Sequence, residues 1–285
     1  MTKRFSLRSW RKAQLRRQLQ AQLLSMQTAD YSQSAIVFAP HEDDETLGCG
    51  GTIIQKQRAG AAIHLVFMTD GQASHAHLIS PQQLAEMRTQ EAIAAAQTLG
   101  LPQSQVQFLG FPDGHLGSHQ ESAIAQVEQL LLKLQPQQIF IPYFREPDFI
   151  PDHRSTHQIV TTALRRTSLK VTVYEYPIWF WCHWPWMRLD WLQVGTIGRL
   201  KLGIKSLIRT VQQGWYPWKD FTVAVDISPV LSQKRRALAC HKSQMEQLFE
   251  MPQWTTLAEV SEGDFLDCLL QPQEIFYRWE SNKTR

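Results

Sequence analysis

Residues 34–51 read Ser34-Ala-Ile-Val-Phe-Ala-Pro-His-Glu-Asp-Asp-Glu-Thr-Leu-Gly-Cys-Gly-Gly51, an apolar run followed by acidic residues and then by glycines. The apolar run at 34–39 is typical of a buried strand. The stretch 46–60, which follows the acidic residues, is predicted as a helix that ends at Gly60. A strand that passes through a polar turn directly into a helix indicates an α/β fold.

The same alternation continues along the chain. Further strands are expected at 62–68, 106–109, 138–142 and 171–176, and further helices at 80–100, 119–135 and 152–166. Strands separated by single helices pair in parallel through right-handed crossovers. Residues 31–176 are therefore predicted to form a Rossmann-like, doubly wound and mostly parallel sheet with helices on both faces.

Three further parts are expected around this core. Residues 1–30 form a basic helical extension, and 31–285 form a single domain. A tryptophan-rich insertion at 177–220 is expected to be a lid or a membrane-facing segment. A strand at 221–227, alternating like an edge strand, and a helix at 228–248 follow it.

The composition indicates a folded domain in a reducing compartment. Of 285 residues, 43% are hydrophobic and 19% are charged, and the net charge of +3 does not by itself indicate a nucleic-acid partner. Four cysteines without CxxC spacing argue against a disulfide framework and against a cysteine-bound zinc. No apolar run reaches the roughly 18 residues of a membrane span, and no signal-type stretch follows the basic N-terminus. We therefore expect a cytoplasmic protein.

A dense set of charges lies where the first strand ends. His41 is followed by Glu42, Asp43, Asp44 and Glu45. Carboxylates so close together repel one another unless a positive charge lies among them, and a divalent cation is the simplest source of that charge. Nitrogen and oxygen ligands favour zinc, with Fe2+ or another divalent metal as the alternative.

The loop after the fourth predicted strand supplies more histidines. His153 and His157 lie four residues apart at the start of a helix and share one of its faces. The first and fourth strands of a doubly wound sheet can be neighbours, which would bring His153 beside His41 and Asp44. Two histidines and one aspartate leave a coordination position for water. Each motif alone is weak, since a lone histidine is usually a surface residue and an acidic cluster can be a solvated loop.

The signature Pro40-His41-Glu42-Asp43-Asp44-Glu45 resembles the (A/P)HPDDE motif of the PIG-L/LmbE deacetylase family, and residues 46–52 resemble its usual continuation. Further similar motifs follow in order: Thr69-Asp70-Gly71, Arg88-x-x-Glu91, Phe111-Pro-Asp113-Gly114, Pro151-Asp152-His153 and Lys234 with His241-x-Ser243-Gln244. Together they span residues 36–244. The resemblance implies a Rossmann-like fold and a zinc-dependent hydrolase that removes N-acetyl groups from GlcNAc-containing substrates.

The resemblance also implies roles for individual residues. The implied metal ligands are His41, Asp44 and His153. Asp43 corresponds to the general base that activates the attacking water, and Arg88 and Asp113 correspond to positions that contact the sugar. Without the family, Arg88 and Glu91 would be interpreted as a surface pair on a helix, and Asp113 as part of a Phe-Pro-Asp-Gly turn.

Two positions depart from the family pattern. Glu42 stands where the family usually has proline, at a side chain that points away from the metal in that pattern. Ile150 stands where the family often has a histidine that helps to stabilise the tetrahedral intermediate. An oxyanion donor is worth roughly 3–4 kcal/mol of barrier. Either His157, His183 or Tyr143 replaces it, or catalysis is weaker or different.

Two motifs leave a choice between structural and functional roles. Glu45 is expected to orient His41 or a backbone group, or simply to favour the start of a helix. The C-terminal motif of His241, Ser243 and Gln244 either closes the site or contacts the substrate.

The tryptophan-rich segment and the N-terminus also suit a membrane surface. Basic residues accompany the tryptophans, namely Arg188, Arg199, Lys201, Lys205 and Arg209, and residues 5–24 can form a basic amphipathic helix. This pattern is compatible with peripheral contact with the inner face of a membrane and, if such contact exists, with a lipid-linked sugar substrate. The ordinary alternative is tryptophan in the core or stacked on sugar, with the charged helix packed on the domain.

The leading hypothesis is a metal-dependent N-deacetylase that acts on a small amino sugar or a glycolipid. One alternative is an amidase that acts on another sugar conjugate. A second is a catalytically weakened family member that binds a sugar or a partner protein, which Ile150 keeps open. A nucleotide-binding Rossmann protein fits poorly, because the first turn is acidic and lacks GxGxxG.

Overall fold

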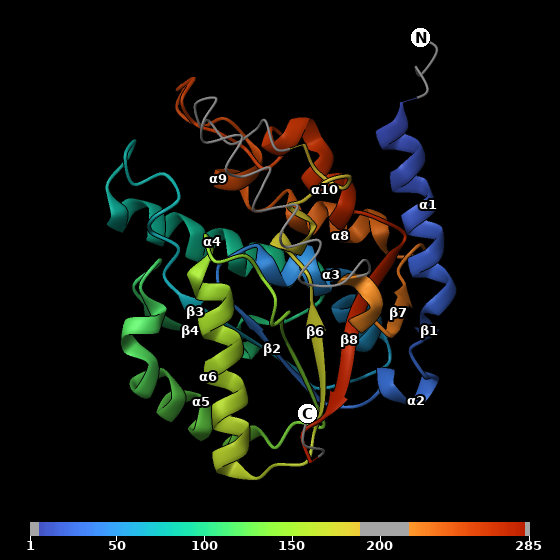
Figure 1. The fold of residues 1–285 in the computed structure, drawn as a ribbon. Coiled ribbons are helices and arrows are strands. Elements are labelled where there is room, and N and C mark those ends of the chain that lie inside the picture. Colours follow the sequence, from blue (N-terminus) through green and yellow to red (C-terminus); the bar gives the residue numbers. More distant parts are fainter. Residues whose placement is uncertain (1–5, 189–216, 283–285) are drawn as a thin grey trace.

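The computed structural model describes residues 6–188 and 217–282 (Figure 1). Within these ranges one eight-stranded sheet has the order β1-β7-β8-β6-β5-β2-β3-β4. Its strands are β1 Leu24–Ser25, β2 Ala35–Ala39, β3 Ile63–Thr69, β4 Val106–Phe111, β5 Gln138–Pro142, β6 Thr172–Tyr176, β7 Val223–Asp226 and β8 Gln273–Glu280.

The described helices lie mainly between the strands. They are α1 Leu7–Gln22, α2 Thr28–Tyr31, α3 Asp44–Arg58, α4 Pro81–Leu99, α5 Gln120–Leu134, α6 Pro151–Thr167, α8 Leu231–Leu238, α9 Lys242–Met245 and α10 Asp264–Leu269. Short 3₁₀ turns are η1 Gln103–Gln105, η2 Leu116–His119, η3 Trp179–Trp181, η5 Pro217–Asp220 and η6 Val260–Gly263. None of the helices within these ranges is long and apolar enough to cross a membrane.

The strands β4, β3, β2, β5 and β6 pair in parallel, which confirms the predicted Rossmann-like sheet. Strand β2 lies between β3 and β5, so the first and fourth predicted strands are neighbours. Helices α5 and α6 cover one face and α3 and α4 the other (Figure 1). The polar turns after the strands therefore gather at one edge of the sheet.

Strand β2 is apolar throughout because both of its faces are covered. Ala35, Val37 and Ala39 belong to the core under α3 and α4, whereas Ile36 and Phe38 belong to the core under α5 and α6. This alternation of side chains between two faces is the period of a strand. Strand β2 ends at Ala39, so the acidic cluster, which follows in the chain, lies at the carboxyl edge of the sheet.

Glycines after the acidic cluster allow α3 to lie very close to the sheet. A Cβ atom at Gly48 would lie 2.3 Å from Cδ2 of Tyr176, and one at Gly51 would lie 2.4 Å from Cγ2 of Ile227. Any larger side chain would push the helix away. The close approach places the first turn of α3, with Asp44, at the end of β2.

Two expectations for the C-terminal part are wrong. The strand expected at an edge, β7, lies between β1 and β8, and β8 inserts antiparallel between β6 and β7. The helix expected at 228–248 divides into α8 and α9. The break falls at His241, which has non-helical backbone angles and whose ring bonds to Glu45 at 3.0 Å. A tertiary hydrogen bond therefore overrides the helical pattern.

The N-terminal helix α1 packs on the domain through Leu15 and Leu19. Its basic residues Arg8, Lys12 and Arg16 pair with Asp264 and Asp267 of α10. One face of α1 is therefore packed on the domain, as the ordinary alternative expects.

Part of the tryptophan-rich segment is also core. Trp181 and Trp186 are buried, whereas Trp184 is exposed. Arg188 pairs with Glu262 at 2.7 Å. The other residues that suggested a membrane contact, including Trp191, Arg199, Lys201, Lys205, Arg209 and Trp215, lie outside the described residues.

Candidate metal and catalytic site

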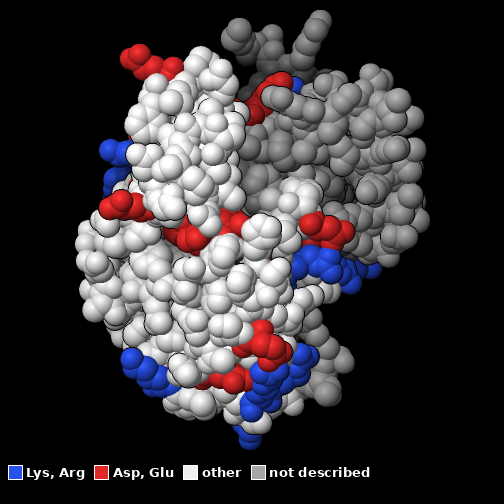
Figure 2. Space-filling view, turned by 90° about the vertical axis from the view of Figure 1, so that its left-hand side faces the viewer, with Lys and Arg blue, Asp and Glu red and all other residues white. Residues whose placement is uncertain are grey.

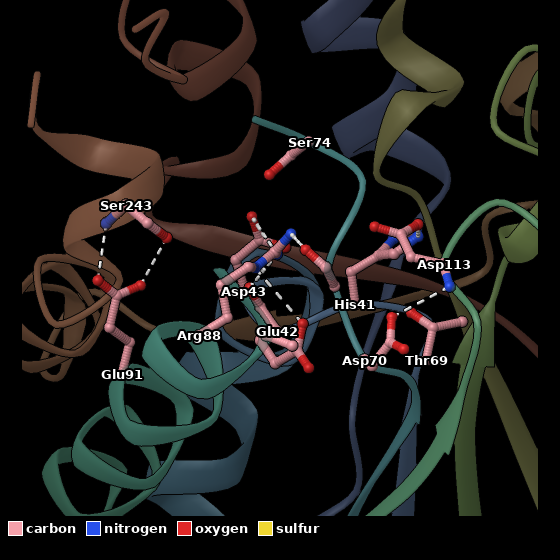
Figure 3. A network of polar contacts seen from close by, with 12 residues as sticks. His41, Glu42, Asp43, Thr69, Asp70, Ser74, Arg88, Glu91, Asp113 and Ser243 are labelled. Carbon is pink, nitrogen blue, oxygen red and sulfur yellow. Dashed lines mark hydrogen bonds and ion pairs between the residues drawn. The ribbon is translucent and has the colours of Figure 1, made fainter. Parts of the chain in front are cut away.

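The predicted site residues come together at the carboxyl edge of the sheet. His41 follows β2, Asp113 follows β4, and His153 lies in the first turn of α6 after β5. Arg88 reaches the same place from α4, and Figure 3 shows it beside His41 and Asp43. Residues up to 112 positions apart in the chain thus share one site because parallel strands end at one edge.

His41, Asp44 and His153 lie close enough to hold one ion. Their ligand atoms all lie within 4.8 Å of one another. Oδ2 of Asp44 is 3.2 Å from Nδ1 of His41 and 3.2 Å from Nε2 of His153. Two imidazoles and one carboxylate form a donor set typical of catalytic zinc.

The chemistry of these donors fits a cation. His153 is fully buried, yet its Nδ1 has no hydrogen-bond partner, and its Nε2 has only the contact with Asp44 at 3.2 Å. Buried polar atoms of this kind usually have one. Burial lowers the pKa of His41, but hydrogen bonds to Asp113, Asp152 and Asp44 outweigh it, so the pKa is raised well above its usual value. The surrounding carboxylates thus favour a positive charge at this point.

A second set of donors shares His41. Nε2 of His41 lies 3.1 Å from Oδ1 of Asp113 and 3.4 Å from Oδ2 of Asp152. Asp152, however, already accepts hydrogen bonds from the backbone N–H groups of Gly114 at 2.6 Å and Leu116 at 3.1 Å. Oδ2 of Asp44 accepts one such bond, from the backbone N–H of His41 at 3.1 Å, and His153 accepts none. The set with His153 is therefore the less occupied one, and Asp113 and Asp152 contact the other side of the His41 ring.

Asp43 lines the same pocket in a strained conformation. Its φ of 143° is rare for a residue other than glycine. Such strain persists where the surrounding contacts impose it, which is common at active sites. One of these contacts is the hydrogen bond from its backbone N–H to Glu45 at 3.0 Å. Burial raises the pKa of the Asp43 carboxyl to about 7, although the Arg88 guanidinium opposes this shift.

Arg88 is buried and holds the acidic turn, so the interpretation of Arg88 and Glu91 as a surface pair is wrong. Its guanidinium donates to the carbonyl oxygens of Glu42 at 2.6 Å and Gly71 at 3.2 Å, and lies 3.6 Å from Oδ2 of Asp43. The Glu42 side chain, which replaces the family's proline, lies 3.4 Å from Nε of Arg88. Glu42 thus partners the arginine and does not line the pocket.

The C-terminal motif closes the site from the other side. His241 bonds to Glu45 at 3.0 Å, and Glu45 in turn accepts from the backbone of Asp43, so Glu45 orients a backbone group and not His41. Ser243 donates to Glu91 through its N–H at 2.8 Å and its hydroxyl at 2.6 Å (Figure 3). His241 and Ser243 are therefore structural, whereas Gln244 lines the pocket.

The pocket over these residues has a volume of about 700 Å³, open solvent included. Its polar lining residues include His41, Asp43, Asp44, Arg88 and Asp113. Its apolar lining residues include Ile150, Leu257, Trp179 and Phe265. The rings of Trp179 and Phe265 stack with their centroids 4.4 Å apart. Such a pocket suits a ligand with one polar reacting end and one less polar face.

The three side chains considered as substitutes for the missing histidine point elsewhere. His157 bonds to Glu175 at 3.0 Å, the Tyr143 hydroxyl donates to Asp220, and His183 contacts the carbonyl oxygen of Phe180 at 2.8 Å. None of the three is among the described residues that line the pocket, whereas Ile150 is.

The sequence did not reveal two carboxylates of this site. Glu146 is buried 3.8 Å from Nδ1 of His153. Asp152 lies beside His41, and its position in Pro151-Asp152-His153 was a signal that could have found it. Glu146 had no such signal, because its other partners are backbone groups of residues 178–180.

Residues 36–164 match the family model described as PIG-L, GlcNAc-PI de-N-acetylase. Over this segment the chain is similar to the PIG-L family. The matched segment contains His41, Asp43, Asp44 and His153, and it confirms the resemblance seen in the motifs.

Two relatives carry the name 1D-myo-inositol 2-acetamido-2-deoxy-alpha-D-glucopyranoside deacetylase. The protein from Kineococcus radiotolerans is 36% identical over 100 residues, which are 33% of this chain and only 27% of that protein. The protein from Rhodococcus opacus is 26% identical over 240 residues, covering 72% of this chain and 79% of that protein.

A solved structure supports the fold. The N,N'-diacetylchitobiose deacetylase from Pyrococcus horikoshii, determined with its inhibitor MPG, matches with a TM-score of 0.61. The match covers 99% of this chain and 96% of that one at 19% sequence identity. At this identity the likeness bears on the fold alone.

Proposed function

We propose that this protein is a metal-dependent hydrolase that removes the N-acetyl group from a GlcNAc-containing substrate. One observation carries the proposal: the ligand atoms of His41, Asp44 and His153 lie within 4.8 Å of one another. Asp43 lines the pocket beside them. The names of the relatives, which are deacetylases of acetamido sugars, support the same reaction.

The three residues would hold the cation through Nδ1 of His41, Oδ2 of Asp44 and Nε2 of His153. A divalent cation in this position lowers the pKa of water from 15.7 to about 7 and polarises a carbonyl group. The donor set suits Zn2+, with Fe2+ as the alternative. The carboxylates of Asp113 and Asp152 would keep the His41 ring in place from its other side.

Asp43 is proposed as the general base. Its carboxyl, with a pKa of about 7 in the metal-free protein, accepts a proton from water and returns it to the departing amine. The Arg88 guanidinium 3.6 Å away keeps the carboxylate in its orientation. Arg88 and Asp113 line the pocket and are also proposed to contact the sugar.

A lipid-linked form of the substrate is a finer proposal. A second pocket of about 660 Å³, open solvent included, lies beside the first and shares Leu47 with it. Its walls include Leu19, Trp181 and Trp186. Peripheral membrane contact would use the exposed Leu7 and Trp10 of α1. Flotation with anionic vesicles tests this form, and a protein that stays at the bottom of the gradient would oppose it.

We also propose a cytoplasmic reaction on a small molecule. Four free cysteines support a reducing compartment. Figure 2 shows Lys and Arg in small, separate groups on one face and a band of acidic side chains across its middle. This arrangement favours a small substrate over a nucleic acid.

The decisive experiment combines metal analysis with an assay of amine release. Purified protein is analysed for bound metal and then incubated with GlcNAc-containing compounds, with and without a chelator. We expect about one equivalent of divalent metal and amine release that the chelator abolishes and added Zn2+ restores. Bound metal without amine release would favour the binding alternative, and release from other conjugates would favour the amidase. Release that survives complete metal removal would refute the proposal.

A further inference from the structure

Glu146 is a buried carboxylate that takes no direct part in the proposed chemistry. It lies in the loop between β5 and α6, with 1% of its surface exposed. It accepts hydrogen bonds from three successive backbone N–H groups, those of Ile178 at 2.8 Å, Trp179 at 2.8 Å and Phe180 at 3.3 Å. These bonds hold the carboxylate at the start of η3.

The same carboxylate faces a proposed metal ligand. Oε2 of Glu146 lies 3.8 Å from Nδ1 of His153, and this nitrogen has no hydrogen-bond partner. An approach of roughly 0.8 Å would bring the pair to the ~3.0 Å of a hydrogen bond. A proton on Nδ1 would then point at the carboxylate, which leaves the lone pair of Nε2 directed toward Asp44.

Glu146 also contacts a residue that lines the pocket. Oε2, the atom nearest His153, is also the atom that accepts from the N–H of Trp179. Trp179 lines the pocket and stacks on Phe265 with centroids 4.4 Å apart. One oxygen atom therefore contacts both a candidate ligand in α6 and an aromatic pocket residue in η3, which follow the neighbouring strands β5 and β6.

We infer that Glu146 is a positioning residue that orients His153 for a divalent cation and ties this orientation to Trp179. Metal binding and the shape of the substrate pocket are then coupled through one carboxylate. The inference rests on the metal site of the proposed function and is independent of the substrate.

The test is a zinc titration of the metal-free, full-length protein. Glu146→Gln keeps the size of the side chain but presents an amide to His153, and it removes one acceptor for the N–H groups of η3. We expect zinc affinity to fall roughly 10–100-fold, the usual effect of removing a partner of a metal-binding histidine. Competition with a chromophoric chelator measures this without any assay of activity.

The chain offers a matched control in Glu175→Gln. Glu175 is equally buried, accepts from the backbone N–H of Phe144 at 3.0 Å, and lies 3.0 Å from Nε2 of His157. It is thus a carboxylate–imidazole pair away from the metal donors. We expect this variant to bind zinc like the wild type even if its stability falls.

A second measurement follows the connection to the pocket wall. We expect zinc to change the near-ultraviolet circular dichroism of the wild type. We expect this change to be smaller in Trp179→Phe, which keeps the backbone N–H of residue 179. If Glu146→Gln does not fold, this measurement on the wild type and Trp179→Phe tests the inference in its place. Wild-type zinc affinity in Glu146→Gln, or a zinc-induced signal unaltered by Trp179→Phe, would overturn the inference. Absence of zinc binding by the wild type itself would instead overturn the proposed function.

Discussion

Nε2 of His41 lies 3.1 Å from Oδ1 of Asp113, on the side of the ring opposite Asp44. Asp113 also accepts from the backbone N–H of Ala73 at 2.9 Å, and its pKa is lowered: burial raises it, but the contact with His41 outweighs burial. The residue that the family pattern assigns to the sugar is thus also placed to orient His41, a proposed metal ligand.

The two roles of Asp113 predict different results for Asp113→Asn. If the carboxylate orients His41, metal affinity falls roughly 10–100-fold. If it only contacts sugar, KM rises and metal affinity stays. We expect the loss of metal affinity, measured by chelator competition, with the exposed Asp148→Asn as the control. Unchanged metal affinity would leave Asp113 as a substrate contact alone.

Asp43→Asn should separate metal binding from catalysis. The amide cannot take a proton from water, so we expect kcat to fall roughly 10²–10⁴-fold. Asparagine has nearly the same size and shape as aspartate, so the variant should keep the turn in which residue 43 has a φ of 143°. Metal content, measured by elemental analysis, should stay near that of the wild type. Full activity of this variant would exclude Asp43 as the base.

Ile150→His tests whether the missing histidine limits the reaction. Ile150 lines the pocket, and the three proposed substitutes do not. An oxyanion donor is worth roughly 10²–10³ in kcat, so we expect Ile150→His to raise kcat about 10-fold or more. Ile150→Leu, which changes shape without adding a donor, is the control. An unchanged kcat would mean that another group of the pocket already serves the oxyanion.

The candidate ligands could be predicted because they depend on local pattern and simple topology. An apolar strand followed by His41 and Asp44 defines one half of the site. The parallel pairing of β2 with β5 then places His153 beside it. These features do not depend on how the side chains pack.

Other features depend on tertiary contacts that leave no periodic pattern in the sequence. His157 shares a helix face with His153, but one turn further along α6 it meets Glu175 of β6 and not the metal donors. The bond between His241 and Glu45 joins residues 196 positions apart and interrupts a helical pattern. Glu146 could not be found because backbone groups, which are the same in every sequence, are its main partners.

The buried Lys56 is expected to make the stability of the folded protein depend on pH. It is 1% exposed and donates to the carbonyl oxygen of Asp30 at 2.8 Å and to Gln138 at 2.7 Å. Burial lowers its pKa from 10.5 to about 8. Between these two values the unfolded chain binds the proton more tightly, so this group makes the protein more stable as pH rises from about 8 to 10.5.

Lys56→Met removes this contribution. It also leaves the buried Oε1 of Gln138 unpaired, at a cost of roughly 1–3 kcal/mol, together with the partly buried carbonyl oxygen of Asp30. We expect the loss of stability relative to the wild type, measured by urea unfolding, to be larger at pH 10 than at pH 7. The exposed Lys170→Met should show no such difference. An equal loss at both pH values would mean that the lysine keeps its ordinary pKa.

We expect helix α1 to open locally more often when its ion pairs are removed. Lys12 and Arg16 lie 2.8 and 2.9 Å from Oδ2 of Asp267, in partly exposed positions. Exposed pairs are worth only about 0.2–1 kcal/mol each, so Asp267→Asn should hardly change global stability. A terminal helix opens independently of the core, however, and amide exchange in 7–22 should therefore become faster.

Hydrogen-exchange mass spectrometry of the wild type and of Asp267→Asn measures this effect. Exchange in α1 of the wild type should also accelerate at about 1 M salt, where the screening length falls to ~3 Å. Glu121→Gln, which removes an exposed pair with Arg166 on another part of the molecule, should leave α1 unchanged. If Asp267→Asn has no effect either, the apolar contacts of Leu15 and Leu19 alone hold the helix in place.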